Sequence, residues 1–405
     1  MKTVAIITEY NPFHNGHKYQ IDTLRAMFDE ELCGVAIMSG NFVQRGEMAI
    51  ADKLIRARAA VECGIDLVLE LPFPFSMTSA EFFADSGVHI ANAIGVVDYL
   101  AFSSECGDIE ALTKTAKNML DPAFLKRVDD YIADNKYETL GHPAICELAY
   151  KDTFHSDISS EFFSPNNILA LEYIKALTIQ NSSIKPITIK REGAGYNDAK
   201  SESTNLQSAT AIREIIRSDI NSASDFIPKE AFCVYKEAAD NGQMPTEQSN
   251  LDAAVISYFR LNSHADSDEI HDAAGGLYNR LCDMSAEATS IYSLTSMTET
   301  KRFTTARIRR AIWSSYFGVT SSEVKAKPKY TQVLAMSERG RSLLKRIKKT
   351  SDFPIITKPA DYTTYSEAVI SQAERAHKAD SIFALAHKKA ISGNFSLRLT
   401  PYVKK

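Results

Sequence analysis

The sequence predicts an α/β fold, in which a parallel sheet with crossover helices is followed by a mainly α-helical region. Three observations predict it. Apolar runs of strand length alternate with amphipathic segments of helix length through the first half of the chain. Strand signals fade at about Ser222, where helical periodicity takes over. At 405 residues the chain also exceeds the size at which one core stops growing. We therefore expect two domains, over residues 1–221 and 222–405.

The first domain is expected to be Rossmann-like. Its predicted strands are Val4–Ile7, Val35–Met38, Leu67–Leu71, Tyr99–Phe102 and Ile184–Ile189. Its predicted helices are His17–Phe28, Met48–Glu62, Ala80–Ala93, Ile109–Met119, Asn167–Leu177 and Ala209–Ile216. Ligands bind at the carboxyl ends of the strands in sheets of this kind, so the loops that follow the strands are expected to form one site.

The second domain is expected to be mainly helical. Helical periodicity is found over Ala253–Leu261, Thr305–Phe317 and Ser366–Lys389, after a polar loop at Ala239–Asn250. On the Thr305–Phe317 helix, Ile308, Ile312 and Tyr316 share one face because they are four residues apart. Trp313, the only tryptophan, is expected in the core.

Composition bounds the function classes. Hydrophobic residues make up 44% and charged residues 24%, which is ordinary for a globular protein and excludes disorder as the main state. No apolar run approaches the roughly eighteen residues that span a bilayer, and the Lys2–Thr8 segment is too short for a signal-peptide core. We expect a cytoplasmic protein with no membrane partner. The six cysteines lack a C-x-x-C spacing, so neither a zinc site nor a disulfide framework is predicted.

The charge is uneven along the chain. Residues 301–350 carry fourteen Lys or Arg and two Asp or Glu, a net charge of +12, whereas the whole chain carries −5. Such a concentration favours a polyanionic partner, although a solvated helix face is the simpler alternative. We expect Arg302, Arg309 and Arg310 to contact nucleic acid, in a region apart from the nucleotide site. The lysines and arginines from Lys325 to Lys349 extend this charge.

The segment from Thr8 to His17 carries the strongest chemical signal. It follows the first predicted strand and contains His14 and His17, separated by Asn15 and Gly16, at the start of a helix. The free N–H groups of a helix start bind phosphate, and the two histidines can donate to an α-phosphate and a departing pyrophosphate. Gly16 would let the nucleotide approach the backbone. The pattern resembles the signature of nucleotidyltransferases, and the simpler alternative is that His14 only caps the helix while His17 packs on its first turn.

A second element, Ser208-Ala209-Thr210-Ala211-Ile212-Arg213, reads as a capped helix start with an arginine one turn in. Arg213 could hold the β- and γ-phosphates, and the alternative is a solvent-exposed arginine. No K-M-S-K-S-like segment follows, which counts against an aminoacyl-tRNA synthetase.

Three further loops follow strands or precede a helix. In the first, Ser39–Gly46, Gln44 and Arg45 are suited to a small anion. In the second, Ser164–Asn167, the asparagines either cap a helix or read the nucleotide. In the third, Lys190–Tyr196, two cations could clamp phosphates or simply lie in solvent.

Together these motifs resemble one specific family. They read E-Y-N-P-F-H-N-G-H, S-G-N-F-V-Q-R-G-E, D-L-V-L-E-L-P, S-P-N-N-I-L-A-L-E-Y, I-K-R-E-G-A-G-Y, S-A-T-A-I-R and T-K-R-F-T-T-A-R-I-R-R. In this order and over essentially the whole chain, they resemble the bacterial tRNA(Met) cytidine acetate ligases. The chain departs from that pattern at Ser103, in Phe102-Ser103-Ser104-Glu105, where the family has Phe-Gly-Ser-Glu.

The resemblance implies an enzyme that activates acetate with ATP as acetyl-adenylate and acetylates N4 of the wobble cytidine of elongator tRNA(Met). It implies catalysis by His14, His17 and Arg213, with Mg²⁺ accompanying ATP and no covalent protein nucleophile. The implied ATP contacts are Ile7, Thr8, Glu9, Tyr10, Asn11, Pro12, Phe13, His14, Asn15, Gly16, His17, Lys18, Tyr19, Gln20, Ser103, Asn167, Lys190, Arg191 and Ser208.

Two other functions fit part of the sequence. An adenylyltransferase for a small phosphorylated metabolite explains the histidine motif equally well, but it leaves residues 301–350 without a purpose. A non-catalytic RNA-binding protein with a vestigial nucleotide fold is disfavoured by the intact His14, His17 and Arg213.

Overall fold

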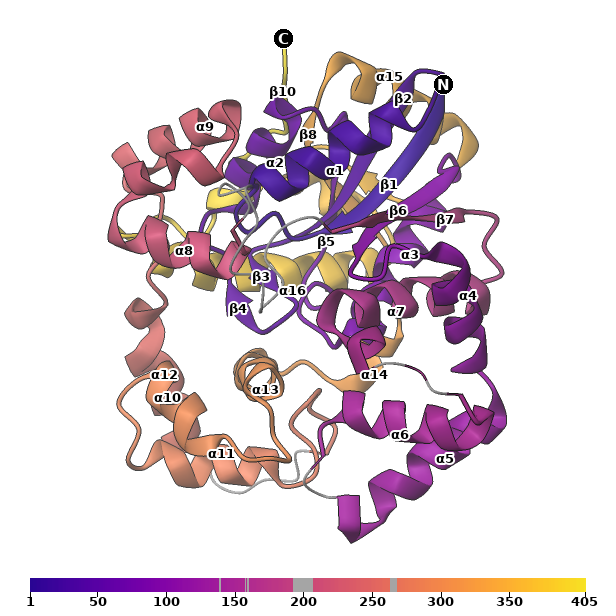
Figure 1. Ribbon diagram of the computed structural model, residues 1–405. Coiled ribbons are helices and arrows are strands. Elements are labelled where there is room, and N and C mark those ends of the chain that lie inside the picture. Colours follow the sequence, from indigo (N-terminus) through magenta and orange to yellow (C-terminus); the bar gives the residue numbers. More distant parts are fainter. Residues whose placement is uncertain (138–139, 157, 159, 192–206, 263–267) are drawn as a thin grey trace.

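The computed structural model describes residues 1–137, 140–156, 158, 160–191, 207–262 and 268–405. The described residues form a central sheet of eight strands with helices on both faces (Figure 1). Five strands run parallel, in the order β5-β2-β1-β6-β7. They are β1 (Lys2–Thr8), β2 (Leu32–Ser39), β5 (Leu67–Leu71), β6 (Tyr99–Ser104) and β7 (Lys185–Lys190). All five predicted strands are confirmed, and the strand order changes direction between β1 and β6, the point at which such sheets bind ligands.

Alternate residues of the buried strands face opposite layers of helices. Val4 and Ile6 pack on one side, where the helices are α1 (Asn15–Ala26), α2 (Lys53–Glu62), α8 (Ala209–Ser218) and α9 (Lys229–Asp240). Ala5 and Ile7 pack on the other, where the helices are α3 (Ala80–Ala93), α4 (Ile109–Asn118), α7 (Pro165–Ile179) and α15 (Glu338–Thr350), with α5 (Pro122–Ala133) and α6 (His142–Phe154) beyond them.

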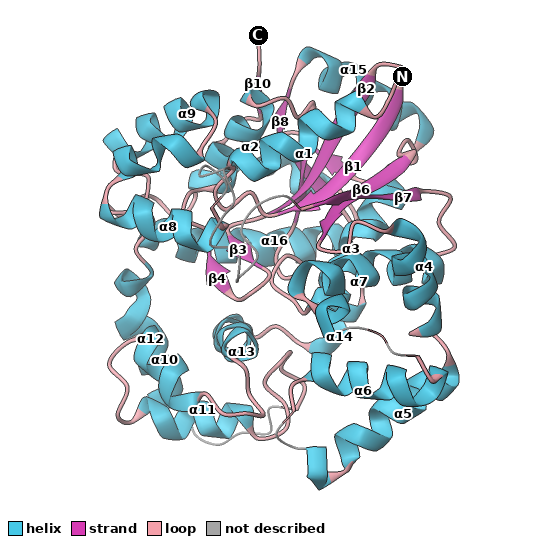
Figure 2. Ribbon diagram, in the orientation of Figure 1, coloured by secondary structure: helices cyan, strands magenta, loops and turns pink. Residues whose placement is uncertain are grey.

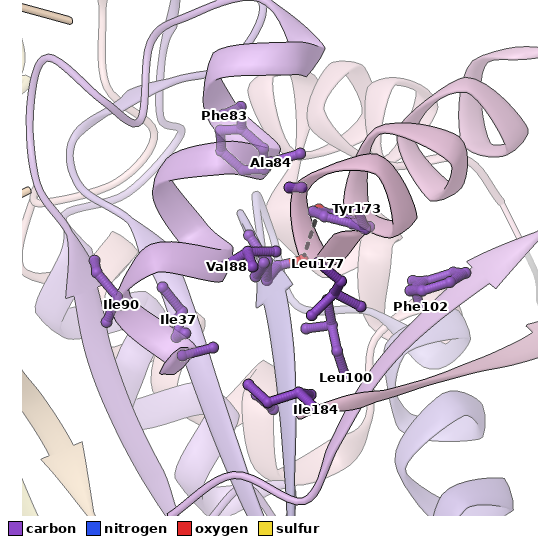
Figure 3. Close-up of a cluster of buried hydrophobic side chains, with 14 of the residues drawn as sticks. Ile37, Phe83, Ala84, Val88, Ile90, Leu100, Phe102, Tyr173, Leu177 and Ile184 are labelled. Atoms are coloured by element: carbon purple, nitrogen blue, oxygen red, sulfur yellow. Dashed lines mark hydrogen bonds between the residues drawn. The ribbon is translucent and has the colours of Figure 1, made fainter. Parts of the chain in front are cut away.

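Figure 3 shows the second of these layers, in which Phe83 and Val88 of α3 and Tyr173 of α7 cover Ile37, Leu100 and Phe102 of the sheet.

A second core lies beyond the carboxyl ends of the parallel strands. It is formed by α10 (Asp252–Leu261), α11 (Leu277–Ser285), α12 (Ile291–Thr298), α13 (Thr305–Phe317) and α14 (Ser321–Lys325). Trp313 is fully buried there, 5.1 Å from the Phe42 ring, so its predicted place in the core is confirmed. Phe42 belongs to the hairpin of β3 (Phe42–Val43) and β4 (Glu47–Met48), which joins this core to the sheet.

The hairpin explains one wrong boundary. A helix was predicted from Met48, but β4 and a turn come first and α2 begins at Lys53. Asp52 caps that helix, because its side chain accepts a hydrogen bond from the Leu54 N–H. Gly46 has a φ of +71°, and a Cβ there would lie 2.5 Å from the backbone nitrogen of Arg310. The hairpin therefore packs directly against the backbone of α13, which only glycine permits.

The chain returns to the sheet after the helical region, which the sequence did not predict. Strand β8 (Thr331–Met336) pairs antiparallel with β5, and β10 (Tyr402–Val403) and β9 (Ile355–Ile356) pair with β8. The last long helix, α16 (Glu367–Phe383), runs beneath these strands and reaches the second core through Phe383 (Figure 2).

The expected assignment of all of residues 222–405 to a separate helical unit is therefore corrected. Apolar residues of β8 and α9 pack into the cores of the α/β layers, and the second core is built mainly from residues 251–324.

Candidate active site

The turn after β1 places both histidines at the start of α1. His14 is the N-cap residue, and its Nδ1 accepts a hydrogen bond from the Gly16 N–H at 3.1 Å. In return, Nδ1 of His17 accepts from the His14 N–H at 3.2 Å. The simpler alternative, a capping role, is thus present in the structure. It uses only one nitrogen of each ring, and leaves both Nε2 atoms for other partners.

Gly16 has a structural purpose in addition to the one expected. A Cβ at this position would lie 2.9 Å from Cε1 of His14, closer than side-chain contacts normally come. Glycine is therefore needed so that the His14 ring can fold over the first turn of α1. The glycine shapes the histidine pair before any nucleotide arrives.

The two imidazoles are close and neutral. Their ring centroids are 3.8 Å apart with a tilt of 31°. Burial, and then the nearby Arg191 charge, lower the pKa of His14 to about 3. Burial, then His14 and Arg191, lower the pKa of His17 well below its usual value. Because each Nδ1 accepts a hydrogen bond, the proton of each neutral ring lies on Nε2. The pair thus presents two Nε2–H donors, which suits an anionic ligand.

A cavity of about 230 Å³ opens beside this turn, between the carboxyl ends of β1 and β6. The predicted contacts that line it are Ile7, Thr8, Glu9, Tyr10, Asn11, His17, Gln20, Ser103 and Arg191. The remaining residues of the Ile7–Gln20 segment form the turn and helix behind the cavity. Phe13, for example, is buried and donates its N–H to the Tyr235 hydroxyl at 2.8 Å. Ser103, the departure from the family pattern, lies at the cavity wall with its side chain partly buried.

Two asparagines in the first turn of α7 organise the opposite wall. Asn167 is fully buried, and its Oδ1 accepts from the N–H groups of Glu105 and Cys106. Asn166 lines the cavity and accepts from the Arg191 guanidinium at 3.0 Å. Asn167 thus holds the loop after β6, and Asn166 orients Arg191. Neither caps α7 with its side chain, because the N-cap residue is Ser164.

Lys190, the second cation predicted to clamp phosphates, ends β7 and lies away from the cavity. The aliphatic part of Lys190 packs against Gly107, where a Cβ would lie 2.7 Å from the Cβ of Lys190. Lys190 is exposed and does not line the cavity. Residues 192–196 of the predicted phosphate loop lie outside the described part of the chain.

Arg213 is held in a cluster with its neighbours. Ser208 caps α8 as predicted, since its Oγ accepts from the Ala211 N–H at 3.2 Å. Arg213 donates to the Asn11 carbonyl and to Oε2 of Glu47, both at 3.0 Å. The other oxygen of Glu47 pairs with Arg309 of α13. A single carboxylate therefore joins the arginine expected to bind phosphate and an arginine expected to bind nucleic acid, which corrects the separation of the two regions.

Glu9 is a partly buried carboxyl group that lines the cavity. Its Oε1 accepts from the Gln44 N–H at 3.0 Å. Burial raises the pKa of Glu9, against the opposing effects of that hydrogen bond and of Arg213. The described residues contain no cluster of three or more metal-ligating side chains. No helix of the described residues combines the length and apolar character that crossing a bilayer needs.

The basic residues of 301–350 do not form one surface. Arg310 is buried in an ion pair with Asp272 at 2.6 Å, and Arg307 donates to backbone carbonyls of the same loop. Arg302 precedes α13 instead of lying on it. Helix α15 lies at the amino-terminal edge of the sheet (Figure 1), since Ser337 bonds to Asp66 just before β5, whereas the cavity opens at the carboxyl edge. The expectation of a single nucleic-acid face is therefore corrected.

The comparisons with known proteins agree with this geometry. The HIGH nucleotidyl transferase family matches residues 1–394. A tRNA(Met) cytidine acetate ligase of Caldanaerobacter subterraneus is 37% identical over 393 residues, covering 96% of each chain. One from Thermosipho africanus is 34% identical over 381 residues, covering 93% of this chain and 89% of that one. The chain belongs to the tRNA(Met) cytidine acetate ligase family. The resemblance stated from the sequence motifs is confirmed.

Solved structures of this ligase family have the same fold. A crystal structure of Thermotoga maritima TmcAL bound with alpha-thio ATP superimposes with a TM-score of 0.90 at 28% identity, covering 100% of this chain and 99% of that one. The apo form gives a TM-score of 0.91 at 29% identity, with the same coverage. The predicted α/β fold class is thereby confirmed.

Sequence reasoning missed some residues of the cavity. Phe83, Leu169 and Tyr173 line it, and the Tyr173 hydroxyl donates to the Ile7 carbonyl at 3.3 Å. They come from α3 and α7, whose apolar faces look like ordinary core faces in the sequence. Only the packing of these helices over the carboxyl end of β1 brings them to the site.

Proposed function

We propose that this protein uses ATP to activate acetate as acetyl-adenylate and then acetylates N4 of the wobble cytidine of elongator tRNA(Met). The observation that carries the proposal is the neutral His14–His17 pair at the switch point of the sheet, in which His17 lines the cavity and His14 lies in the turn behind it. Family membership and the ATP analogue bound to the Thermotoga relative support ATP as the co-substrate.

The first step would be a displacement at the α-phosphorus. An acetate oxygen attacks it, and the bond to the bridging oxygen breaks, so that pyrophosphate leaves. The start of α1 and the Nε2–H of His17 stabilise negative charge that develops on the phosphates, because preformed donors need no reorganisation. Arg191, oriented by Asn166, adds a positive charge at the cavity wall. Arg213 would reach the polyphosphate by leaving Glu47.

The second step would be acyl transfer. The cytidine amine attacks the carbonyl carbon of the mixed anhydride, the bond to the AMP oxygen breaks, and the amine loses one proton. No protein nucleophile is needed, because the adenylate is already reactive. The chain's task is to align the two substrates and to exclude water.

Mg²⁺ belongs to the proposal as the partner of ATP. Among the described residues that line the cavity, Glu9 is the only carboxylate. This donor set fits Mg²⁺, which is commonly held by one or two carboxylates together with substrate phosphates. The ion would neutralise phosphate charge, and Glu9 would supply one ligand. We place the reaction in the cytoplasm, where its tRNA substrate is found.

The test is acetate-dependent exchange of pyrophosphate into ATP, run with a panel of carboxylates and with or without tRNA. Acetate should support exchange without tRNA, and tRNA should be needed only for acetylcytidine formation. His17→Ala should abolish exchange and leave the circular dichroism spectrum unchanged, whereas Lys236→Ala, on the exposed surface of α9, should exchange normally. Exchange that depends on a phosphorylated metabolite and not on acetate would instead establish the adenylyltransferase alternative.

A further inference from the structure

A cleft of about 790 Å³ adjoins the nucleotide cavity and has more than three times its volume. Its walls come from the β3–β4 hairpin, from α8, from α12 and from the start of α13. The charged residues among its lining are Arg45, Glu47, Arg213, Glu214, Arg217, Glu247, Glu299 and Arg309. The cleft thus joins the α/β layers to the second core, between the two parts of the molecule.

The two spaces are neighbours at the level of single residues. Gln44 lines the nucleotide cavity and Arg45 lines the cleft. Likewise, Ala209 lines the cavity and Thr210 lines the cleft. Glu9 ties this boundary together through its hydrogen bond to the Gln44 N–H. A substrate that reacts in the cavity can therefore extend directly into the cleft.

Tyr292 is the feature of the cleft that the proposed chemistry has not used. It lies in the first turn of α12, and its side chain is 78% exposed. Among the Phe, Tyr and Trp side chains that the structure describes, it is the only exposed one. The turn that carries it is fixed, because Ser290 caps the helix and the Ile291 N–H donates to Asp252 at 2.8 Å. An exposed aromatic ring on a rigid turn is a ready platform for stacking.

Arg45 supplies a positive charge in the same cleft. It is exposed, and no ion pair or hydrogen bond joins its side chain to the residues that the structure describes. By contrast, Arg213 and Arg309 share Glu47, and Arg217 pairs with Glu214 at 2.7 Å. A stacking ring and an available cation are the two contacts that single-stranded RNA requires, one for a base and one for a phosphate.

We infer that this cleft holds the anticodon-loop nucleotides next to the wobble cytidine, and that Tyr292 stacks on one of their bases. The inference rests on the proposed function, because the wobble cytidine itself must reach the acyl carbon at the nucleotide cavity. The nucleotides next to it then continue along the RNA backbone into the adjoining cleft. Anticodon loops suit such a site, since their bases can be splayed from one another and stacked on protein side chains.

The first experiment compares Tyr292→Ala, Tyr292→Phe and the control Met297→Ala. Met297 is 37% exposed on the same helix and does not line the cleft. Tyr292→Ala should lower tRNA affinity and kcat/KM for tRNA about five- to hundredfold, because alanine removes the stacking of one base. Tyr292→Phe should keep most of the wild-type tRNA affinity and kcat/KM for tRNA. All three variants should exchange pyrophosphate with acetate like the wild type, since the ring is not part of the nucleotide cavity.

The second experiment identifies the stacked base. tRNA(Met) with an abasic nucleotide at the wobble position, or at either of its neighbours, is bound to the wild type and to Tyr292→Ala. At one neighbouring position the abasic tRNA should weaken wild-type binding and leave Tyr292→Ala unchanged, because the partner of the ring is already missing.

Additive losses at both neighbouring positions would overturn the stacking, as would wild-type kcat/KM in Tyr292→Ala. A stacked partner at the wobble position itself would overturn the assignment to its neighbours. A wild-type protein that fails to exchange pyrophosphate with acetate would contradict the proposed function instead, so the two failures are distinguishable.

Discussion

Helices α13 and α15 share a basic composition but use their charges in opposite ways. On α13, Arg307 and Arg310 bind the loop at Asp272, and Arg309 pairs with Glu47. On α15, Arg339 pairs with Glu31 and Asp66. The other cations of α15 are exposed and have no acidic partner among the described residues, and they are Arg341, Lys345, Arg346, Lys348 and Lys349.

The two helices also lie at opposite edges of the sheet. The hairpin after β2 brings α13 to the carboxyl edge, where the nucleotide cavity opens. Both ends of α15 are fixed at the amino-terminal edge, through Ser337 to Asp66 and through Ser351 to the Ala93 carbonyl. A charge that is partnered inside the fold stabilises the structure, whereas an exposed and unpartnered charge is available to a polyanion. The local net charge of +12 thus combines paired cations inside the fold with exposed cations that have no acidic partner among the described residues.

The largest expected effect concerns the buried pair on α13. Arg310→Met should destabilise the protein by about 3–5 kcal/mol, because it leaves the largely buried Asp272 carboxylate without its guanidinium partner. Lys348→Ala on α15 should change the free energy of unfolding by no more than about 0.5 kcal/mol. Urea unfolding of both variants measures the difference. Equal free energies of unfolding would contradict the distinction between partnered cations of α13 and unpartnered cations of α15.

The second effect concerns RNA binding by α15. Replacing Lys345, Arg346 and Lys349 together with glutamine should weaken tRNA binding roughly tenfold or more. It should also reduce the slope of log affinity against log salt by about one for each lost phosphate contact. Pyrophosphate exchange without tRNA should be unchanged, because α15 lies at the opposite edge from the cavity. Unaltered affinity and salt slope would mean that α15 faces only solvent.

A smaller effect links α13 to the nucleotide cavity. Arg309→Ala leaves Glu47 with Arg213 as its remaining partner, so that Arg213 is held more firmly away from the polyphosphate. We expect the KM for ATP in the exchange reaction to rise about two- to tenfold, as for the loss of roughly 0.5–1.4 kcal/mol. Glu47→Gln should change the KM in the opposite direction. An unchanged KM in both variants would mean that α13 serves only the RNA surface and does not influence ATP binding.

The smallest effect is a dependence on pH. Although burial acts to raise the pKa of Asp272, the Arg310 charge holds it below its usual value. In Arg310→Met that charge is gone, so burial should raise the pKa of the carboxyl group above its unfolded value. The folded variant then takes up protons that the unfolded chain does not, and it becomes relatively more stable as the pH falls.

The destabilisation by Arg310→Met should therefore be smaller at pH 6 than at pH 8. His271, 3.4 Å from Asp272, would act in the same direction by binding a proton. The stability of Lys348→Ala relative to the wild type should not change over this range. A constant difference for both variants would mean that the Asp272 carboxyl group is solvated in the absence of Arg310.

The sequence by itself determined the parallel strands, most of the helices that connect them and the histidine motif at the first turn. These features are local, because a strand followed by a capped helix is written in consecutive residues, as in Val4 to His17. It also determined the family, because the motifs occur in order along the whole chain. The catalytic and ATP-binding assignments stay predictions, although the structure gathers nine of the predicted contacts around one cavity.

Only the tertiary structure decided which charged side chains are unpartnered and that the nucleotide cavity adjoins the larger cleft. Strand β8 was missed because its apolar run lies within a lysine-rich segment, and it becomes a strand by pairing with β5, more than 250 residues earlier in the sequence. Glu47, Arg213 and Arg309 come from three distant segments, and no local pattern predicts that they meet. Burial and pairing depend on the whole fold, because a cation becomes structural only where packing removes water and supplies a carboxylate.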